Sequence, residues 1–395
     1  MNQWKYVFSQ LTEFVPRYAF DTCVEKYSGN KRCKSLTCWE QFLAMSFWQV
    51  TWQESLRSLV VCLNAHANKL YHLWFRNQQL AKSTLFEANE KRDWRIYQDF
   101  AHILIQQVTR LHKISSEKER NEFKEISGSI YALDSTTIDV CLHVFEWAHF
   151  RKTKWAIKLH TLMDIRWSIP KVINITHGKC HDVYMLDELD YEAWSFYIFD
   201  RAYIDFQRFS SIDEDGAFFV TRAKRNIQYH RLYSHRVDKT TWVRCDQTIQ
   251  LTWLEPYKHY QNKLRRVKYY DSKQNKTYVF ITNNFILKPD IIAELYRRRW
   301  KIETFFRWIK QNLKIKRFWW HSENAVKLQV WIAICIYLVV IIMKHQLKTW
   351  HSIYEILQIL SVSVFDKTSL KTLFDKYNYK NLEDVPQEQL QLRVF

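Results

Sequence analysis

Four side chains between residues 296 and 310 have the types and spacing to act on a phosphodiester. On an α-helix at about 100° per residue they share one face about 60° wide, and they are Tyr296, Arg299, Glu303 and Lys310. Glu303 is the single acid between residues 295 and 320, among nine Lys and Arg. A carboxylate in such a field stays ionised and is well placed to hold a metal ion beside a phosphate. An amphipathic helix with a solvated basic face is the alternative interpretation, but the shared face and the solitary acid favour the chemical one.

Two further acids lie where they could join Glu303 at a metal site. Asp134 ends the segment Ile130-Tyr-Ala-Leu, and Asp200 ends Phe196-Tyr-Ile-Phe. Both segments predict strands, so each acid is expected at a strand end. Asp134 could instead be a turn residue and Asp200 a helix N-cap. The nearby acids Asp139 and Asp205 are competitors that rank lower.

The spacing Tyr-x2-Arg-x3-Glu-x6-Lys resembles the signature around the last catalytic acid in the insertion-sequence-four family of DDE transposases. The segments at Asp134 and Asp200 resemble the contexts of the family's first two catalytic acids, and residues 152–160 resemble its basic third strand. The likeness covers roughly residues 5 to 345. It implies a ribonuclease-H-like core in which Asp134, Asp200 and Glu303 are the catalytic residues and the ligands of two Mg²⁺ (or Mn²⁺) ions.

The chemistry of such a site follows from charge. Cutting a phosphodiester with water needs a deprotonated nucleophile and a stabilised leaving 3′ oxygen. Two Mg²⁺ ions a few Å apart provide both. Because Mg²⁺ is hard and keeps several waters, a few carboxylates suffice as protein ligands.

Contacts to DNA are expected from the basic and aromatic residues around these acids. Arg299 can fork two phosphate oxygens, and Lys310 acts as a point charge. For Tyr296 the resemblance favours contact with the strand end that is cut. Residues of second rank are Arg201, Lys154, Lys158 and His160. The resemblance also implies that an aromatic residue of the insertion holds a base flipped out of the duplex when a DNA hairpin forms. The candidates are Trp242 and Trp253, for which a packing role is the alternative. The insertion is shorter than that of the best-characterised relatives.

The formal charge of +18 is concentrated in two segments. Residues 216–276 hold 14 Lys and Arg against 4 Asp and Glu, and residues 295–320 hold 9 against 1. The remaining residues balance to zero. Focused positive charge on an otherwise neutral chain predicts a polyanion-binding surface. Within the first segment, Arg265 and Arg266 are the expected phosphate contacts.

The predicted fold class is mixed: α+β or α/β, with an all-helical N-terminal region and a helical C-terminal tail. Helices are expected at residues 37–49, 54–63 and about 81–113, the first two as a helix-turn-helix-like pair or as packing helices. Strands are expected at 130–134, 137–143, 155–163, 169–176, 196–199 and 217–221. The expected divisions are a DNA-binding region (1–115), the core in two parts (116–221 and 287–345), a β-rich insertion (222–286) and the tail (346–395).

Several classes of protein are disfavoured by composition. The eight cysteines lack metal-binding spacing, and Cys180-His181-Asp182 lacks a partner pair for zinc. Four glycines cannot build a phosphate-binding Gly-rich loop. The 14 consecutive apolar residues from Val330 to Met343 are fewer than the roughly 18–20 that span a bilayer, so a buried helix is expected. Together these features predict a cytoplasmic protein with reduced thiols and no membrane contact.

The predicted function is therefore transposition: metal-dependent cleavage and strand transfer at transposon ends. The expected partners are double-stranded DNA, as terminal inverted repeats and as target, and a second copy of the chain in a homodimer on DNA. Two alternatives remain, a DNA-binding regulator descended from such an enzyme and a nuclease of the same fold.

Overall fold

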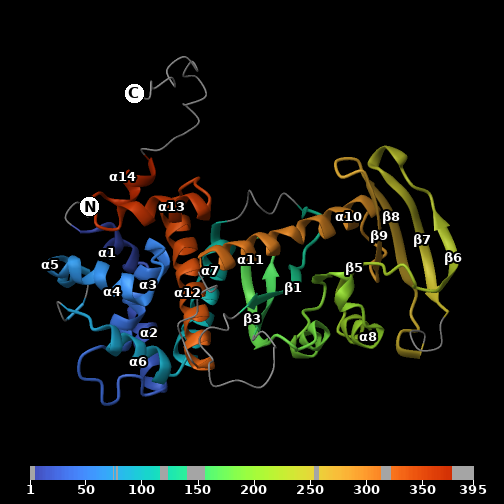
Figure 1. The fold of residues 1–395 in the computed structure, drawn as a ribbon. Coiled ribbons are helices and arrows are strands. Elements are labelled where there is room, and N and C mark those ends of the chain that lie inside the picture. Colours follow the sequence, from blue (N-terminus) through green and yellow to red (C-terminus); the bar gives the residue numbers. More distant parts are fainter. Residues whose placement is uncertain are drawn as a thin grey trace, which may run out of the picture. The chain divides into compact units, whose positions relative to one another are not determined.

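The computed structural model describes residues 5–73, 75–76, 79–115, 123–139, 156–252, 258–312 and 322–375. Two compact units divide the chain, one of residues 1–104 with 319–395 and the other of residues 105–318. Figure 1 labels their helices and strands in chain order. Lys154 and Trp253, two of the predicted DNA contacts, lie outside the described residues.

The first unit is helical, as the sequence predicts. Capping fixes the two predicted helices at 37–49 and 54–63: the Thr37 side chain caps one and Ser55 the other, each in a reciprocal capping box. Trp52 closes the first in the left-handed conformation at φ 54°. Its helices are α1 (Val7–Thr12), α2 (Arg17–Lys26), α3 (Cys38–Thr51), α4 (Leu56–Ala65), α5 (Ala67–Leu70), η1 (Tyr71–Leu73), α6 (Lys82–Lys91), the start of α7 (Arg95–Ser115), α12 (Glu323–Leu347), α13 (Ile353–Ser363) and α14 (Leu370–Asp375). The stretch 81–113, predicted as one helix, is thus two.

The apolar run at 330–343 lies within α12 and is buried, as predicted. Among the described residues α12 is the one helix long and apolar enough to cross a membrane, and 94% of its most apolar stretch is buried. The prediction placed residues 287–345 in the catalytic core, whereas α12 packs against α3, α6 and α13 in the first unit. A helix that is apolar on every side must be enclosed on every side, and the N-terminal helices provide that enclosure.

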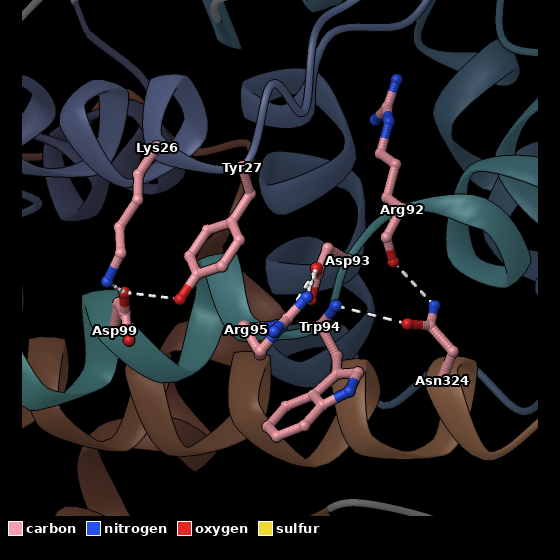
Figure 2. Close-up of polar contacts among 8 residues, drawn as sticks. All are labelled: Lys26, Tyr27, Arg92, Asp93, Trp94, Arg95, Asp99 and Asn324. Atoms are coloured by element: carbon pink, nitrogen blue, oxygen red, sulfur yellow. Dashed lines mark hydrogen bonds and ion pairs between the residues drawn. The ribbon is translucent and has the colours of Figure 1, made fainter.

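Asn324 pins the first turn of α12 to the turn between α6 and α7. Its amide donates to the Arg92 carbonyl at 2.7 Å, and its oxygen accepts from the Trp94 N–H at 3.3 Å (Figure 2). The amide also donates to the Asn89 carbonyl at 3.0 Å. Buried backbone groups of a turn need such partners. One side chain near the C-terminal end of the chain therefore stabilises a turn more than 200 residues earlier.

The second unit is built on a nine-stranded mixed sheet in the order β3-β2-β1-β4-β5-β9-β8-β7-β6. Strands β1, β2 and β3 are antiparallel, and β4 and β5 run parallel to β1. The strands are β1 (Ile130–Asp139), β2 (Ala156–Asp164), β3 (Ile169–His177), β4 (Phe196–Phe199), β5 (Phe218–Arg222), β6 (Tyr229–His235), β7 (Val243–Leu251), β8 (Leu264–Asp271) and β9 (Lys276–Thr282). Short helices are η4 (Asp182–Glu188), η5 (Arg201–Tyr203), α8 (Phe206–Glu214) and η6 (Lys239–Thr241).

The sheet differs from the prediction in three respects. Residues 130–134 and 137–143 were expected as two strands, but β1 is continuous through Asp134 to Asp139. The edge strand β6 was not predicted. The insertion at 222–286 is β-rich as expected, yet its strands extend the core sheet, because β9 pairs with β5 and satisfies backbone groups that would otherwise form an open edge.

Two consecutive helices, α10 (Pro289–Arg298) and α11 (Trp300–Asn312), carry the predicted signature. The prediction has one helix there, whereas the chain tightens at Arg299, where the N–H of Arg299 bonds to the Tyr296 carbonyl and that of Ile302 to the Arg299 carbonyl. Asn283 follows β9, and its side chain bonds to the backbone of Phe219 and Ala217 at 2.9 Å each. The end of β9 is thereby held to β5 immediately before α10.

Candidate active site

Parallel pairing of β1 with β4 brings Asp134 and Asp200 side by side. The paired residues run from Ile130 beside Phe196 to Leu133 beside Phe199. Asp134 directly follows Leu133, and Asp200 directly follows Phe199. Leu133 and Phe199 both lie in the hydrophobic core of this unit. Because successive strand residues point to opposite faces, Asp134 leaves the sheet on the face opposite that core. The prediction that Asp134 ends a strand is wrong; what ends there is its pairing with β4.

Helices α10 and α11 meet these acids with three of the four residues of the predicted face. The Tyr296 hydroxyl donates to Asp200 Oδ1 at 3.1 Å. Arg299 donates from Nη1 to Asp134 Oδ2 at 2.6 Å and from Nη2 to Glu303 Oε1 at 2.8 Å. Arg299 thus bridges the first and third acids, and Tyr296 reaches the second.

Burial is the largest electrostatic influence on this cluster, and the charge of Arg299 opposes it at Asp134. Burial raises the pKa of Asp134 to about 6; Arg299 opposes the shift, while Glu303 and Asp200 add to it. Burial raises the pKa of Tyr296 to about 12. For Arg299, burial acts to lower the pKa, but the surrounding acids, Asp134 foremost, leave it raised. Three carboxylates face one guanidinium, which bonds to two of them, Asp134 and Glu303.

This donor set fits a hard divalent cation. Its ligands would all be carboxylate oxygens, which Mg²⁺ and Mn²⁺ prefer. Two buried polar atoms beside Asp134 also lack any partner: Arg299 Nε, and the hydroxyl of Thr161, which pairs with Asp134 across β1 and β2. Within the described part of the chain no three His, Cys, Asp or Glu side chains form a ready-made metal cluster. The acids are instead linked through Arg299.

The other predicted DNA contacts divide by burial. Lys310 on α11 and Arg201 on η5 are exposed. Lys158 is half-buried and donates to the Cys180 carbonyl at 2.7 Å. His160 has no exposed surface, bonds to Thr176 at 2.8 Å, and its pKa is lowered by burial to about 4. His160 is therefore uncharged at neutral pH and enclosed, and its assignment as a phosphate contact is wrong.

The assignment of Arg265 as a surface contact is also wrong. Its guanidinium bonds to both carboxylate oxygens of Asp246, at 2.9 and 2.7 Å, and to the Leu287 carbonyl at 2.6 Å, all out of solvent. Arg265 thus ties β7 and β8 to the segment that leads into α10. Arg266 points the other way, is half-buried and donates to Gln247 at 2.9 Å. The physical reason is strand alternation, which sends one of two adjacent arginines inward.

The remaining candidates have clear structural surroundings. Trp242 is 46% exposed and packs against Tyr270 with ring centroids 5.8 Å apart. Asp205 caps α8 by accepting from two backbone N–H groups, so this competitor of Asp200 has a structural role. The side chain of Asp139 lies outside the described part of the chain.

Asp182 belongs to a polar cluster that sequence reasoning missed. Ser135, adjacent to Asp134, donates to Asp182 Oδ1 at 2.7 Å, and Lys158 Nζ lies 3.2 Å from the same oxygen. Because Ser135 alternates with Asp134 along β1, this cluster is on the other face of the sheet. The available signal was an acid that follows strand β3, in a segment considered only as a zinc site.

Comparison with known proteins identifies the family. The model described as "Transposase DDE domain" matches residues 125–339, more than half of the chain and the whole of this site. The chain belongs to the transposase DDE domain family. A second model, described as a domain of unknown function, matches residues 3–76.

Curated relatives of this DDE-domain chain carry the same description. A protein of Geobacillus stearothermophilus named as the probable transposase for insertion sequence element IS5377 is 31% identical over 207 residues, 52% of this chain and 54% of that protein. A Sinorhizobium fredii protein named as transposase y4zB is 30% identical over 229 residues, 57% of this chain and 63% of that protein. The chain therefore covers less than two thirds of either relative. The piggyBac transposase in a synaptic complex with hairpin DNA, solved by cryo-EM, matches 87% of this chain and 82% of that one at 12% identity and a TM-score of 0.37.

Proposed function

We propose that this chain is the transposase of an insertion sequence, cutting and joining DNA at the ends of its element. The observation that carries the proposal is the convergence of Asp134, Asp200 and Glu303 around Arg299 and Tyr296. Relatives named as insertion-sequence transposases support it. Its substrates would be duplex terminal repeats and target DNA, both bound by a homodimer. One route of cleavage would pass through a DNA hairpin intermediate.

The strand order supports a ribonuclease-H-like core. Three antiparallel strands in the order β3-β2-β1, followed by β4 and β5 parallel to β1, form one half of the sheet. Asp134 and Asp200 lie at its central strands, and helix α11 packs against β1. This arrangement supplies acids from two neighbouring strands and one helix to a common point.

In this proposal Asp134, Asp200 and Glu303 would hold two Mg²⁺ or Mn²⁺ ions. When bound, such ions activate the attacking hydroxyl or water and stabilise the leaving 3′ oxygen. Arg299 keeps the acids together before DNA arrives, because it neutralises part of their mutual repulsion. A phosphate of the strand end then offers Arg299 an alternative bidentate partner, and Tyr296, Lys310 and Arg201 contact the same end.

The proposed function is tested with purified protein and DNA that carries the element's own ends. We expect cleavage followed by joining to a target duplex in Mg²⁺ or Mn²⁺, and binding without cleavage in Ca²⁺. Both products are resolved on denaturing gels. Cleavage without joining would identify a nuclease, and binding without cleavage in any metal would identify a regulator; undiminished cutting in excess chelator would contradict the metal-dependent reaction.

Arg299 should couple the binding of DNA to the binding of metal. If its guanidinium occupies the acids in the DNA-free protein, Arg299→Gln should raise the Mn²⁺ affinity of that protein by roughly tenfold, within the usual range of coupling between sites. Free Mn²⁺ measured by electron paramagnetic resonance reports this without any need for activity. Adding DNA should raise the Mn²⁺ affinity of the parent but not of the variant.

The matched control is Arg298→Gln, which removes the same charge one residue away from an arginine that pairs with Glu294 at 2.7 Å. Its Mn²⁺ affinity should follow the parent. Equal Mn²⁺ affinities for the parent and Arg299→Gln, with and without DNA, would show that Arg299 does not exchange its bonds to the acids for bonds to a phosphate.

A further inference from the structure

The loop between α2 and α3, residues 27–36, carries three exposed cations within four positions. Lys31, Arg32 and Lys34 are all exposed, and the loop contains no acid. Within the described parts of the chain none of the three has an ion pair or a side-chain hydrogen bond. Outside the two basic segments of the sequence, the charges of the chain sum to zero, because acids elsewhere offset the three cations of the loop.

The loop is held in a defined shape. Asn30 Oδ1 accepts from the Cys38 N–H at 2.8 Å, and Arg92 donates to the carbonyls of Thr37, at 3.0 Å, and Leu36. Gly29 is required where it stands, since a Cβ there would come within 2.6 Å of Ile96 and 2.8 Å of Cys38. The three cations are thus presented on fixed backbone, which lowers the entropy cost of binding a ligand.

Three nearby acids do not neutralise the loop, because each pairs with another cation. Asp93 pairs with Arg95 at 2.6 Å, and Asp99 with Lys26 at 2.6 Å (Figure 2). Glu87 pairs with Lys91 at 2.9 Å.

Arg92 adds to the positive charge of the loop. It bonds to carbonyl oxygens, to the Gln41 side chain at 2.8 Å and to the Cys33 sulfur at 3.3 Å, and none of these partners is a carboxylate. Figure 2 shows its guanidinium pointing away from Asp93. Four positively charged side chains therefore gather at one place, and none of them has an ion pair with a described residue.

These charges border a hollow of about 430 Å³. Loop residues form one side, and residues of α6 and the following turn form the other: Thr84, Glu87, Ala88, Lys91, Arg92 and Asp93. Its aromatic side chain, Tyr27, donates its hydroxyl to Asp99 at 3.0 Å and is half-buried. Without an exposed apolar anchor the hollow lacks the centre of a typical protein–protein interface. A concave, cationic surface of this kind suits phosphate groups.

We propose that the 27–36 loop and Arg92 form a phosphate-binding site that grips the backbone of duplex DNA. The proposal rests on the proposed function in taking DNA as the partner, and it places one contact in the region that matches a domain of unknown function. Phosphate contacts fix register and do not read sequence. The loop should therefore strengthen binding to every duplex alike and leave the choice of terminal sequence to other residues.

The test compares two triple variants of the full chain, each also carrying Glu303→Gln so that DNA is bound without being cut. One replaces Lys31, Arg32 and Lys34 by Gln. The matched control replaces Lys348, Lys367 and Lys371, which are exposed cations of the same unit, by Gln. Fluorescence anisotropy with a duplex end and with an unrelated duplex is measured from low to high salt.

We expect the loop variant to bind both duplexes roughly tenfold or more weakly at low salt. The slope of log affinity against log salt should fall by about 2 to 3, since each phosphate contact contributes about 0.9. The control variant should keep the parent slope, and Lys31→Arg with Lys34→Arg should restore binding. Matching melting temperatures would exclude unfolding.

Equal affinities and slopes for the loop variant and the control would overturn the proposal, as would a loss confined to the terminal duplex. The outcome is independent of catalysis, because cutting is measured separately with the parent chain. If the parent never cuts DNA but the loop variant binds DNA more weakly than the parent, the proposed enzymatic function fails and the loop site stands. If the parent cuts DNA and the loop variant binds DNA as tightly as the parent, the loop site fails and the enzymatic function stands.

Discussion

Glu303→Gln is expected to lower cleavage of the element's ends by roughly a thousandfold or more. Gln keeps the size of the side chain but cannot balance a divalent cation, and losing several kcal/mol of charge stabilisation corresponds to about three powers of ten in rate. Asp134→Asn and Asp200→Asn should have the same effect, because the proposed reaction uses all three acids to hold the same pair of ions. The rate is measured under single-turnover conditions in Mn²⁺.

DNA binding separates a catalytic role from a folding role. Affinity measured in Ca²⁺ should stay near that of the parent for all three variants. Asp205→Asn is the matched control, since it removes an acid five residues after Asp200 and retains the side-chain oxygen that caps α8. Cleavage within tenfold of the parent by any one of the three variants would remove that residue from the active site. Loss of binding by all three would assign them to folding.

Arg265→Ala should destabilise the second unit by about 3–5 kcal/mol, because it leaves the Asp246 carboxylate buried without its partner. The side chains of both residues are only 6% exposed. For a unit of about 200 residues this corresponds to a fall in melting temperature of roughly 10 °C. The Asn284 and Leu287 carbonyls before α10 would also lose their donor. Calorimetry of the full chain, with the two units resolved by their transitions, measures the shift.

Arg266→Ala is the control for Arg265→Ala, since it removes the neighbouring arginine from the opposite face of the same strand. Its cost should be below about 1 kcal/mol, as expected for a half-exposed hydrogen bond. Arg265→Met combined with Asp246→Leu should recover much of the lost stability, because no unpaired charge remains. An Arg265→Ala protein that melts within 2 °C of the parent would show that the buried pair is not required.

Local periodicity predicted much of the geometry of the candidate site. Tyr296, Arg299 and Glu303 lie within eight residues, so helical spacing alone predicts that they share a face. Asp134 and Asp200 each follow a short apolar run that predicts a strand. Strand β4 forms where expected, whereas β1 continues beyond Asp134. In a strand rich in charged residues, the sequence did not indicate which side chain faces the solvent. Arg265 and Arg266 are alike in sequence, and either could have been the exposed one.

The sequence itself determined the helical spacing of the candidate residues, the two segments of excess positive charge, and the order of the strands along the chain. Each of these depends only on residues that are near one another in the sequence. The tertiary structure decided what depends on residues far apart. It set which arginine of a strand faces inward, since that requires Asp246 on β7 and the turn before α10. It enclosed α12 among the N-terminal helices, because an entirely apolar helix is buried wherever enough apolar surface surrounds it. It also gave Arg299 two carboxylates in place of a phosphate, since residues 134 and 303 meet only when β1 and α11 pack together.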